Sequence, residues 1–442
     1  MFSESDAWRR GRAITQLLIL FIFGSATALL ADSRAYIGAL VMPVSGPAIE
    51  DGVLVVRDGK IESVGARSEV VIPSGATQID CSGKTIIPGL ICTHSHIGMG
   101  GGGDSSDPIQ PECWTLDSVN VRAASFERAR AGGLTLVNQM PGSGHLISGR
   151  TTYLKLRRGG KIDDLLIKDA DGWPMGGLKM ANGTNSQRSA PFPGTRAKSA
   201  SLVREAYIKA QEYRDKIEKA VDDPDKMPER DLRLEALVEA LDGKRIVHHH
   251  THRHDDILTV LRLRDEFGFQ VVLHHVSDAW KVADEIAAAG APCSIIVIDS
   301  PGGKLEARDI RLENGVVLEQ AGVNVSFHTD DWITDSRLFL RSAALGVRAG
   351  MSRAGALRAL TLSGAEMLGL DERTGSLEPG KDADFAILDG DPFSVYTQVL
   401  ETWVEGVQVF DRSNPEHLLF AVGGRGAGDD QTFQCCGERG GK

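Results

Sequence analysis

The sequence lacks a dense cysteine pattern, a positive net charge and a hydrophobic run long enough to cross a membrane. Its six cysteines are scattered, with no C-x-x-C pair, which argues against a disulfide scaffold. The formal net charge of −11 argues against a nucleic acid or an anionic membrane as a partner, because an acidic surface does not attract a polyanion. With 42% hydrophobic and 25% charged residues, the composition that remains is that of an ordinary globular protein.

The amino terminus has the pattern of a secretory signal peptide. Three arginines between positions 9 and 12 precede the apolar run 17–23, small residues follow at positions 24–28, and a cleavage point is predicted after Ala31. The apolar run is shorter than the roughly 20 residues of a membrane span. We therefore predict a signal peptide over residues 1–31 and export to the periplasm or the medium, with no stable membrane span after cleavage. An uncleaved signal that anchors the protein in a membrane is the alternative.

Short strands with turns occur near both ends of the chain. Residues 52–60 predict a strand that runs into an Asp-Gly turn, and residues 61–65 predict its hairpin partner. A similar pattern returns close to the carboxyl terminus, at residues 383–388 and 399–410. The predicted parts are a small β-sandwich domain built from residues 32–85 and 375–415, and a disordered carboxy-terminal tail over residues 416–442.

The middle of the chain alternates strand-like apolar runs with helical stretches, which favours βα units around a parallel sheet. The predicted strands are residues 85–91, 134–139, 152–156, 177–180, 245–250, 270–275, 293–298 and 324–327. The predicted helices are residues 118–131, 199–220, 233–241, 256–267, 279–289, 313–321, 338–349 and 353–367. Eight strands in this pattern predict an α/β fold, a (β/α)₈ TIM barrel over residues 86–374, in which each strand ends at a common face.

Two histidines, His94 and His96, follow the first of these strands. Side chains on a strand alternate between its two faces, so these imidazoles point the same way. Such a pair is a natural half of a metal site. Two loop histidines with ordinary hydrogen bonds are the other interpretation of this motif alone.

Other strand ends add ionisable groups: Lys179, a run of histidines from His248 to His254, His274 with His275, and His328 with Asp330. A barrel brings the ends of distant strands to one rim, so these groups are expected to converge. They are costly to bury unpaired, and a metal cluster removes that cost. The alternation places His248, His250 and His252 on the same face, so it does not decide which of them is the metal ligand from this strand.

The sequence resembles the amidohydrolase superfamily. The resemblance rests on the motif at residues 87–96, on residues 375–388, where the chain returns to the β-sandwich, and on the positions of His275 and Asp330. The resemblance covers about residues 33 to 412 and is closest in style to the branch of imidazolonepropionase-like and dipeptidase-like enzymes. It implies a distorted (β/α)₈ barrel with a β-sandwich domain, and a metal-dependent hydrolase with a small-molecule substrate. The implied reaction is cleavage of an amide or cyclic-amide C–N bond, as in a dipeptide or an N-acyl amino acid, through a metal-activated hydroxide.

Carried over residue by residue, the resemblance implies two divalent metal ions, with zinc the first choice and manganese or another ion possible. Asp330 would also move the proton as the catalytic residue. Lys179 would bridge both ions through a CO₂-derived carbamate on its amine. The implied ligands are His94, His96 and Asp330 for the first ion and His250 and His275 for the second, where His250 is preferred over His248 because of its spacing to the residues that follow.

Four further residues are predicted at the rim as substrate contacts: His145, Arg150, Arg253 and Trp332. A structural role for His145 in its loop is equally open. The sequence departs from the family pattern at Cys92, where relatives commonly have aspartate. A deaminase or imidazolone-type ring hydrolase with one metal, a non-catalytic protein of the same fold, and a homo-oligomer remain alternatives that the sequence does not exclude.

Overall fold

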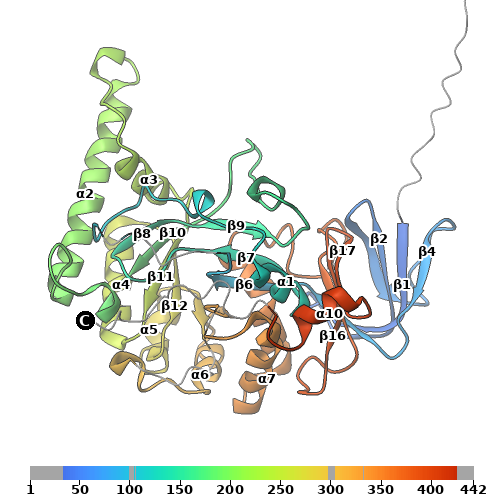
Figure 1. The fold of residues 1–442 in the computed structure, drawn as a ribbon. Helices are drawn as coiled ribbons and strands as arrows, with labels where there is room; N and C mark the ends of the chain where they lie inside the picture. Colours follow the sequence, from blue (N-terminus) through green and yellow to red (C-terminus); the bar gives the residue numbers. More distant parts are fainter. Residues whose placement is uncertain (1–32, 99–103, 105, 297–303, 332, 426–442) are drawn as a thin grey trace, which may run out of the picture.

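The computed structural model describes three hydrogen-bonded sheets, within residues 33–98, 104, 106–296, 304–331 and 333–425. One sheet of eight strands joins the two ends of the chain and lies at the right of Figure 1. The other two sheets, of six and three strands, hold the middle of the chain. The predicted signal peptide and Trp332 lie outside the described residues.

The eight-stranded sheet takes five strands from the amino-terminal part of the chain and three from the carboxy-terminal part. They are β1 (Ser33–Val41), β2 (Ile49–Arg57), β3 (Lys60–Ala66), β4 (Thr77–Asp80), β5 (Thr85–Pro88), β15 (Phe385–Leu388), β16 (Val399–Val404) and β17 (Val407–Asp411). Their order is β17-β16-β15-β5-β1-β2-β3, and β4 pairs with β1. The predicted Asp-Gly hairpin is confirmed between β2 and β3, where Asp58 and Gly59 both have positive φ, 50° and 78°.

This sheet is strongly curled. The ring of Tyr36 on β1 lies 4.9 Å from Phe385 on β15 and 5.5 Å from Trp403 on β16. Because adjacent strands are about 4.8 Å apart, a flat sheet would hold β1 and β16 about 14 Å apart. Strands from the two ends of the chain therefore enclose one shared apolar cluster.

Seven strands of the middle part each run parallel to at least one neighbouring strand, as the alternation of apolar runs predicts. They are β6 (Leu90–Ser95), β7 (Leu134–Gln139), β10 (Leu178–Ala181), β11 (Val247–Thr251), β12 (Val271–His275), β13 (Cys293–Ile295) and β14 (Val325–Phe327). The end of β14 approaches the end of β6, where the amide of Asp330 donates to the carbonyl of His94 at 3.1 Å.

The strand predicted at residues 85–91 is divided between two sheets. Its first half is β5, which pairs with β15, and its second half begins β6. The division falls at Gly89, where a Cβ would lie 2.2 Å from Oγ1 of Thr135, so only glycine permits this approach of the backbone to β7. A continuous apolar run cannot reveal such a change of sheet.

The third predicted strand also differs from expectation, because it is not parallel. Residues on either side of Thr151 form β8 (Ile147–Arg150) and β9 (Thr152–Lys155). β8 runs antiparallel to β10, and β9 runs antiparallel to β7. Apolar periodicity reports that a segment is extended but not its direction, which explains the error.

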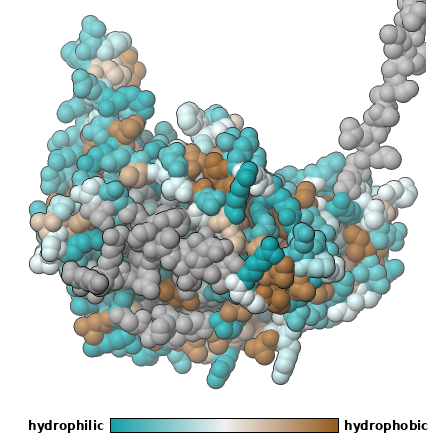
Figure 2. Space-filling view, in the orientation of Figure 1, coloured by the Kyte–Doolittle hydropathy of each residue, from teal (hydrophilic) through white to brown (hydrophobic). Residues whose placement is uncertain are grey.

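Ten α-helices lie within the described residues, and most cover the middle part. They are α1 (Ala124–Ala131), α2 (Arg196–Ala220), α3 (Leu232–Leu241), α4 (His254–Phe267), α5 (Ala283–Ala288), α6 (Asn314–Gln320), α7 (Phe339–Ala349), α8 (Arg353–Leu360), α9 (Leu362–Met367) and α10 (Pro415–Ala421). The single helix predicted over residues 353–367 is broken at Thr361 into α8 and α9. Figure 1 shows α2 and α3 projecting together from the body, and Figure 2 shows that this projection is mostly hydrophilic.

The predicted disordered tail begins with a helix. Asn414 accepts a hydrogen bond from the amide of Glu416 and Pro415 occupies the first turn, which are strong signals for a helix start. Residues 416–421 are therefore helical, contrary to the prediction of disorder, and residues 426–442 of the predicted tail lie outside the described residues. Within the described ranges, no helix is both long and apolar enough to cross a membrane.

A buried ion cluster joins the middle part to the eight-stranded sheet. Lys155, at the end of β9, is fully buried, and its amine contacts Asp382 at 2.7 Å and also Asp384. Arg373 pairs with Asp382 at 2.7 Å, and Lys60 reaches the same carboxylate from β3 at 2.7 Å. The two parts of the fold are therefore joined by an ion cluster whose centre, Lys155 with Asp382 and Asp384, is removed from water.

Candidate metal centre

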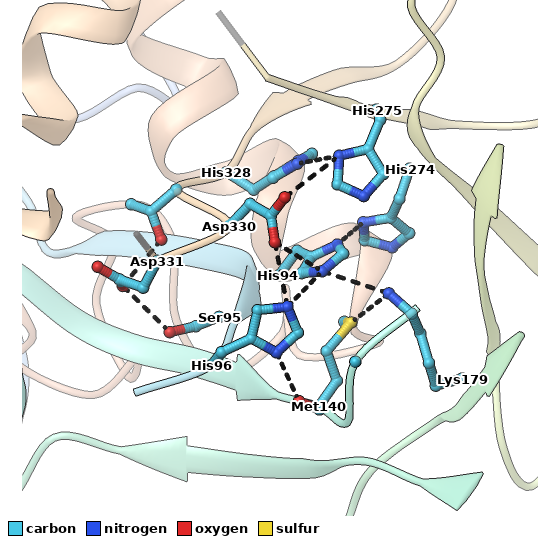
Figure 3. Close-up of polar contacts among 12 residues, drawn as sticks. His94, Ser95, His96, Met140, Lys179, His274, His275, His328, Asp330 and Asp331 are labelled. Carbon is cyan, nitrogen blue, oxygen red and sulfur yellow. Dashed lines mark hydrogen bonds and ion pairs between the residues drawn. The ribbon is translucent and has the colours of Figure 1, made fainter. Parts of the chain in front are cut away.

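The predicted metal ligands converge at the carboxyl ends of the parallel strands. Six side chains come from five strand ends, and all are buried with at most 6% exposure: His94, His96, Lys179, His250, His275 and Asp330. Figure 3 shows five of these residues with their ionisable groups turned toward one another. The convergence expected from the strand pattern is therefore present.

His94, His96 and Asp330 form the tightest group. Nε2 of His96 lies 3.2 Å from Nε2 of His94 and 3.0 Å from Oδ1 of Asp330, and the third side of the triangle is 3.4 Å. Ligands of a tetrahedral zinc ion with bonds of 2.0 to 2.1 Å are about 3.4 Å apart. The spacing of these three atoms fits a metal ion of that size.

Lys179 reaches the same group from β10. Its side chain is fully buried, and its amine lies 3.2 Å from Nε2 of His94 and 3.1 Å from Sδ of Met140 (Figure 3). The amine of Lys179 therefore contacts the group formed by His94, His96 and Asp330 through His94.

His250 and His275 lie beside each other, with ring centroids 4.3 Å apart. Both ring nitrogens of His250, and Nε2 of His275, are buried without a hydrogen-bond partner. His248 instead contacts Tyr153 Oη at 3.1 Å and His274 at 2.9 Å, deeper in the sheet. This geometry favours His250, which the sequence preferred, as the ligand from β11.

Three of the imidazoles are oriented through Nδ1. Nδ1 of His96 lies 2.8 Å from the carbonyl oxygen of Met140, and Nδ1 of His94 lies 3.3 Å from Nδ1 of His274. Nδ1 of His275 faces Nε2 of His328 at 3.1 Å, and His328 is held in turn by Ser294 at 2.7 Å. In each case Nε2 is left for the centre, the arrangement by which neighbouring groups fix metal-binding histidines.

The protonation states also suit a cation. Burial, followed by the charge of Lys179, lowers the pKa of His94 well below its usual value, and burial lowers those of His250 and His275 in the same way. Burial opposes the charge of Asp330, but the hydrogen bond with His96 prevails and the pKa of Asp330 is lowered to about 2. Neutral imidazoles and a charged carboxylate are the forms that bind metal.

Two of the predicted ligands have strained backbones. The backbone angle φ is 69° at His275 and 47° at Asp330. Both values lie in the left-handed region, which residues other than glycine rarely adopt. Each such conformation costs about 1 to 3 kcal/mol and usually persists where function requires it. The strain lies at the two strand ends that carry predicted ligands.

The predicted substrate contacts are placed differently from one another. His145 is buried against Phe192, and burial lowers its pKa. Arg253 is half-exposed after β11 and pairs with Asp255 at 2.8 Å. Arg150 does not join the site, because antiparallel β8 carries it to the start of β10, where it stacks on Trp114.

Cys92 does not face the centre. Its sulfur contacts the carbonyl of His94 at 3.1 Å and Oγ1 of Thr329 at 3.2 Å, and burial raises the pKa of the thiol to about 12. The neutral thiol therefore links β6 to the residues that follow β14.

Four further groups around the centre lie outside the predicted ligand set. His274 and His328 orient predicted ligands, and His252 and Glu306 place further ligand atoms near His250. His252 was visible in the histidine run. No local pattern marks Glu306, whose position depends on a loop between β13 and α6.

The chain belongs to the Amidohydrolase family, whose model matches residues 85–412. This is a family of hydrolases that act on carbon–nitrogen bonds in small molecules. The family thus accounts for the whole middle part and for the return of the chain to the eight-stranded sheet.

An amidohydrolase from Thermotoga maritima is similar in structure, with a TM-score of 0.80 and 32% identity over 86% of this chain and all of that chain. The amidohydrolase tasK of Hapsidospora irregularis is 27% identical over 82% of this chain, which spans 39% of that protein's length. An imidazolonepropionase of Rhizobium rhizogenes is 26% identical over 80% of this chain and 91% of its own length.

Proposed function

We propose that this protein is a metal-dependent hydrolase that cleaves an amide or cyclic-amide C–N bond of a small molecule, such as a dipeptide or an N-acyl amino acid. The observation that carries the proposal is the group of buried imidazoles and one carboxylate whose free ligand atoms face a common space. The similarity to an imidazolonepropionase supports a cyclic amide among the possible substrates.

The residues fit two divalent ions, most simply zinc. His94, His96 and Asp330 would hold one ion, His250 and His275 the other, and Lys179 would join both as a carbamate. Support for the bridge comes from the buried amine of Lys179, 3.2 Å from Nε2 of His94. Ions bound here would supply a Lewis acid for the carbonyl and lower the pKa of water.

Asp330 is the group of this chain that moves a proton. Its pKa of about 2 keeps it ionised at neutral pH, so it can accept a proton from the attacking water and pass it to the leaving nitrogen. The hydrogen bond from the Asp330 amide to the carbonyl of His94 fixes the carboxylate relative to the ligands on β6. The imidazoles hold and orient, and they do not act as the base.

The two central sheets are proposed to form one distorted eight-stranded barrel over residues 86–374, in which the β8–β9 segment fills the third position. Its antiparallel pairing on both sides and the contact between the ends of β14 and β6 support closure. The curled sheet would form the β-sandwich domain of residues 32–85 and 375–415. Export through the signal peptide of residues 1–31 is also proposed, from the sequence pattern alone.

The proposal is tested by elemental analysis of purified protein, together with a screen of dipeptides, N-acyl amino acids and cyclic amides before and after chelation. We expect about two zinc equivalents per chain and activity that chelation removes and metal restores. Release of ammonia from an amidine-like ring would indicate the deaminase alternative. Protein that carries no metal and gains no activity with metal would overturn the proposal.

Lys179→Ala is expected to lower the metal content from about two equivalents to about one, because the second position loses its anionic ligand. Metal content after dialysis against trace zinc is the measurement, and a Lys161→Ala variant, changed on an exposed loop, is the control. An unchanged metal content would exclude the bridging role of Lys179.

His274→Phe is expected to weaken metal binding by about 10- to 100-fold, because the partner that orients Nδ1 of His94 is lost. Competition with a chromophoric chelator measures this affinity. His249→Phe is the matched control, since strand alternation points His249 to the opposite face of β11. Equal affinities in the two variants would show that His274 only fills space.

A further inference from the structure

A second group of ligand atoms lies next to the proposed centre. One nitrogen each of His250 and His252 and one carboxylate oxygen of Glu306 lie within 4.8 Å of one another. His252 follows the last residue of β11, and Glu306 lies in a short 3₁₀-helix, Leu305–Ala307. Neither residue belongs to the predicted ligand set.

His252 is oriented in the same way as the predicted ligands. Its Nδ1 contacts the buried hydroxyl of Ser277 at 2.8 Å, and its Nε2 is buried without a partner. The ring stacks on His275 with centroids 5.2 Å apart and meets His250 edge-on at 4.6 Å. With 7% of the residue exposed, an unpartnered imidazole nitrogen is unlike an ordinary surface histidine.

Glu306 uses only half of its carboxylate within the protein. Oε2 accepts a hydrogen bond from the amide of Thr184 at 2.9 Å and pairs with Arg196 at 3.3 Å. Oε1 is buried and has no partner. Arg196 also pairs with Asp256 at 2.9 Å, so its charge is shared between two carboxylates. Glu306 thus retains an oxygen and part of a negative charge for a ligand.

We propose that His250, His252 and Glu306 form an auxiliary divalent-cation position beside the main centre. Two neutral imidazoles and a carboxylate are a ligand set that binds zinc, and each supplies an atom with no other partner. The proposal rests on the proposed function only through His250, which both positions use.

The auxiliary position is weaker than the main centre. Lys304 lies close enough to act electrostatically on both His250 and His252, and its positive charge opposes a further cation. The position therefore fills only after the main centre is occupied. His250 lies beside His275 and is also a proposed ligand of the main centre. A cation in the auxiliary position therefore competes with the main centre for His250, and excess metal lowers activity.

The experiment is equilibrium dialysis of the full-length protein against rising zinc concentrations, with metal content and activity measured on the same samples. The wild type is expected to take up one further, weaker equivalent, and its activity is expected to fall as that equivalent binds. Glu306→Gln and His252→Asn are each expected to raise the inhibitory zinc concentration at least about tenfold, because loss of supporting groups alone changes metal affinity by 10- to 100-fold.

Matched changes outside the site control for charge and for surface histidines: Glu235→Gln on α3 and His417→Asn on α10 should bind the weaker equivalent as the wild type does. His252→Asn leaves the contacts of Glu306 with Thr184 and Arg196 in place, so it tests the position even where Glu306→Gln unfolds.

The proposal is overturned when both site variants retain the weaker equivalent, or when the wild type never takes one up. It is also overturned when Glu306→Gln leaves zinc binding unchanged but raises KM for a substrate with a free amine, because Glu306 then contacts substrate. The zinc equivalents that bind tightly, measured at limiting zinc, test the main centre of the proposed function. The weaker equivalent tests the auxiliary position alone.

Discussion

Asp330→Asn is expected to lower kcat by about 10²- to 10⁴-fold, the range that a general acid–base group supplies. The amide has the size of the carboxylate, and the backbone contact to His94 does not depend on the side chain. His94 and His96 remain, so metal is expected to stay largely bound. Steady-state kinetics and metal content on the same preparation measure the two effects separately.

The control for this change is Asp411→Asn, a substitution of the same type at the end of β17 in the eight-stranded sheet. Its kcat and metal content should match those of the wild type. If Asp330→Asn keeps its metal and also keeps kcat within about tenfold, Asp330 is a ligand only and another group moves the proton.

Lys155→Met is expected to lower the free energy of unfolding by about 3 to 5 kcal/mol, the cost of removing one partner from a buried ion cluster. The amine of Lys155 is fully buried and contacts both Asp382 and Asp384, so its loss leaves carboxylate charge without compensation. Urea denaturation followed by circular dichroism measures the difference. Lys209→Met, at an exposed pair on α2, should change stability by no more than about 0.5 kcal/mol.

The effect of Lys155→Met should depend on pH in a defined direction. Burial opposes the charge of Asp382, but Lys155 and its other cationic partners hold the pKa of that carboxyl well below its usual value. A depressed pKa stabilises the fold above the pKa of the unfolded chain, about 3.9, and this stability is lost as pH falls below it. Without Lys155 the pKa of the carboxyl lies closer to that of the unfolded chain, so the difference in stability between variant and wild type should shrink as the pH falls below about 4. A constant difference would point to lost packing instead of lost charge.

The positions of the strand ends followed closely from the sequence, and so did the residues gathered there. His94 and His96 were identifiable as a pair because strand periodicity fixes the face of a side chain and a parallel arrangement fixes the end at which it lies. Asp330 joined them as a ligand through the resemblance to the amidohydrolase superfamily. The choice of His250 over His248 depends on where β11 ends, which the histidine run alone left open. In the structure His248 contacts Tyr153 and His274 instead, which leaves His250 as the ligand from β11.

Other features depend on contacts that are distant in sequence. The prediction that Arg150 lies at the rim was wrong. The direction of β8 is set by its pairing with β10, and the residues of β8 alone do not reveal it. The division of one apolar run at Gly89 depends on Thr135 of a neighbouring strand. Glu306 reaches Thr184 across 122 positions, a distance over which no local pattern carries information.

The position of β5 between β1 and β15 has a consequence for biosynthesis. Its partner on one side, β15, is separated from it by some 300 residues and therefore leaves the ribosome much later than β5 does. Until then β5 has an open, apolar edge, and pairing across so long an interval is slow. Newly made chains should therefore be most prone to aggregation while the carboxy-terminal strands are still missing, and shortening the chain before β15 should leave that edge exposed permanently.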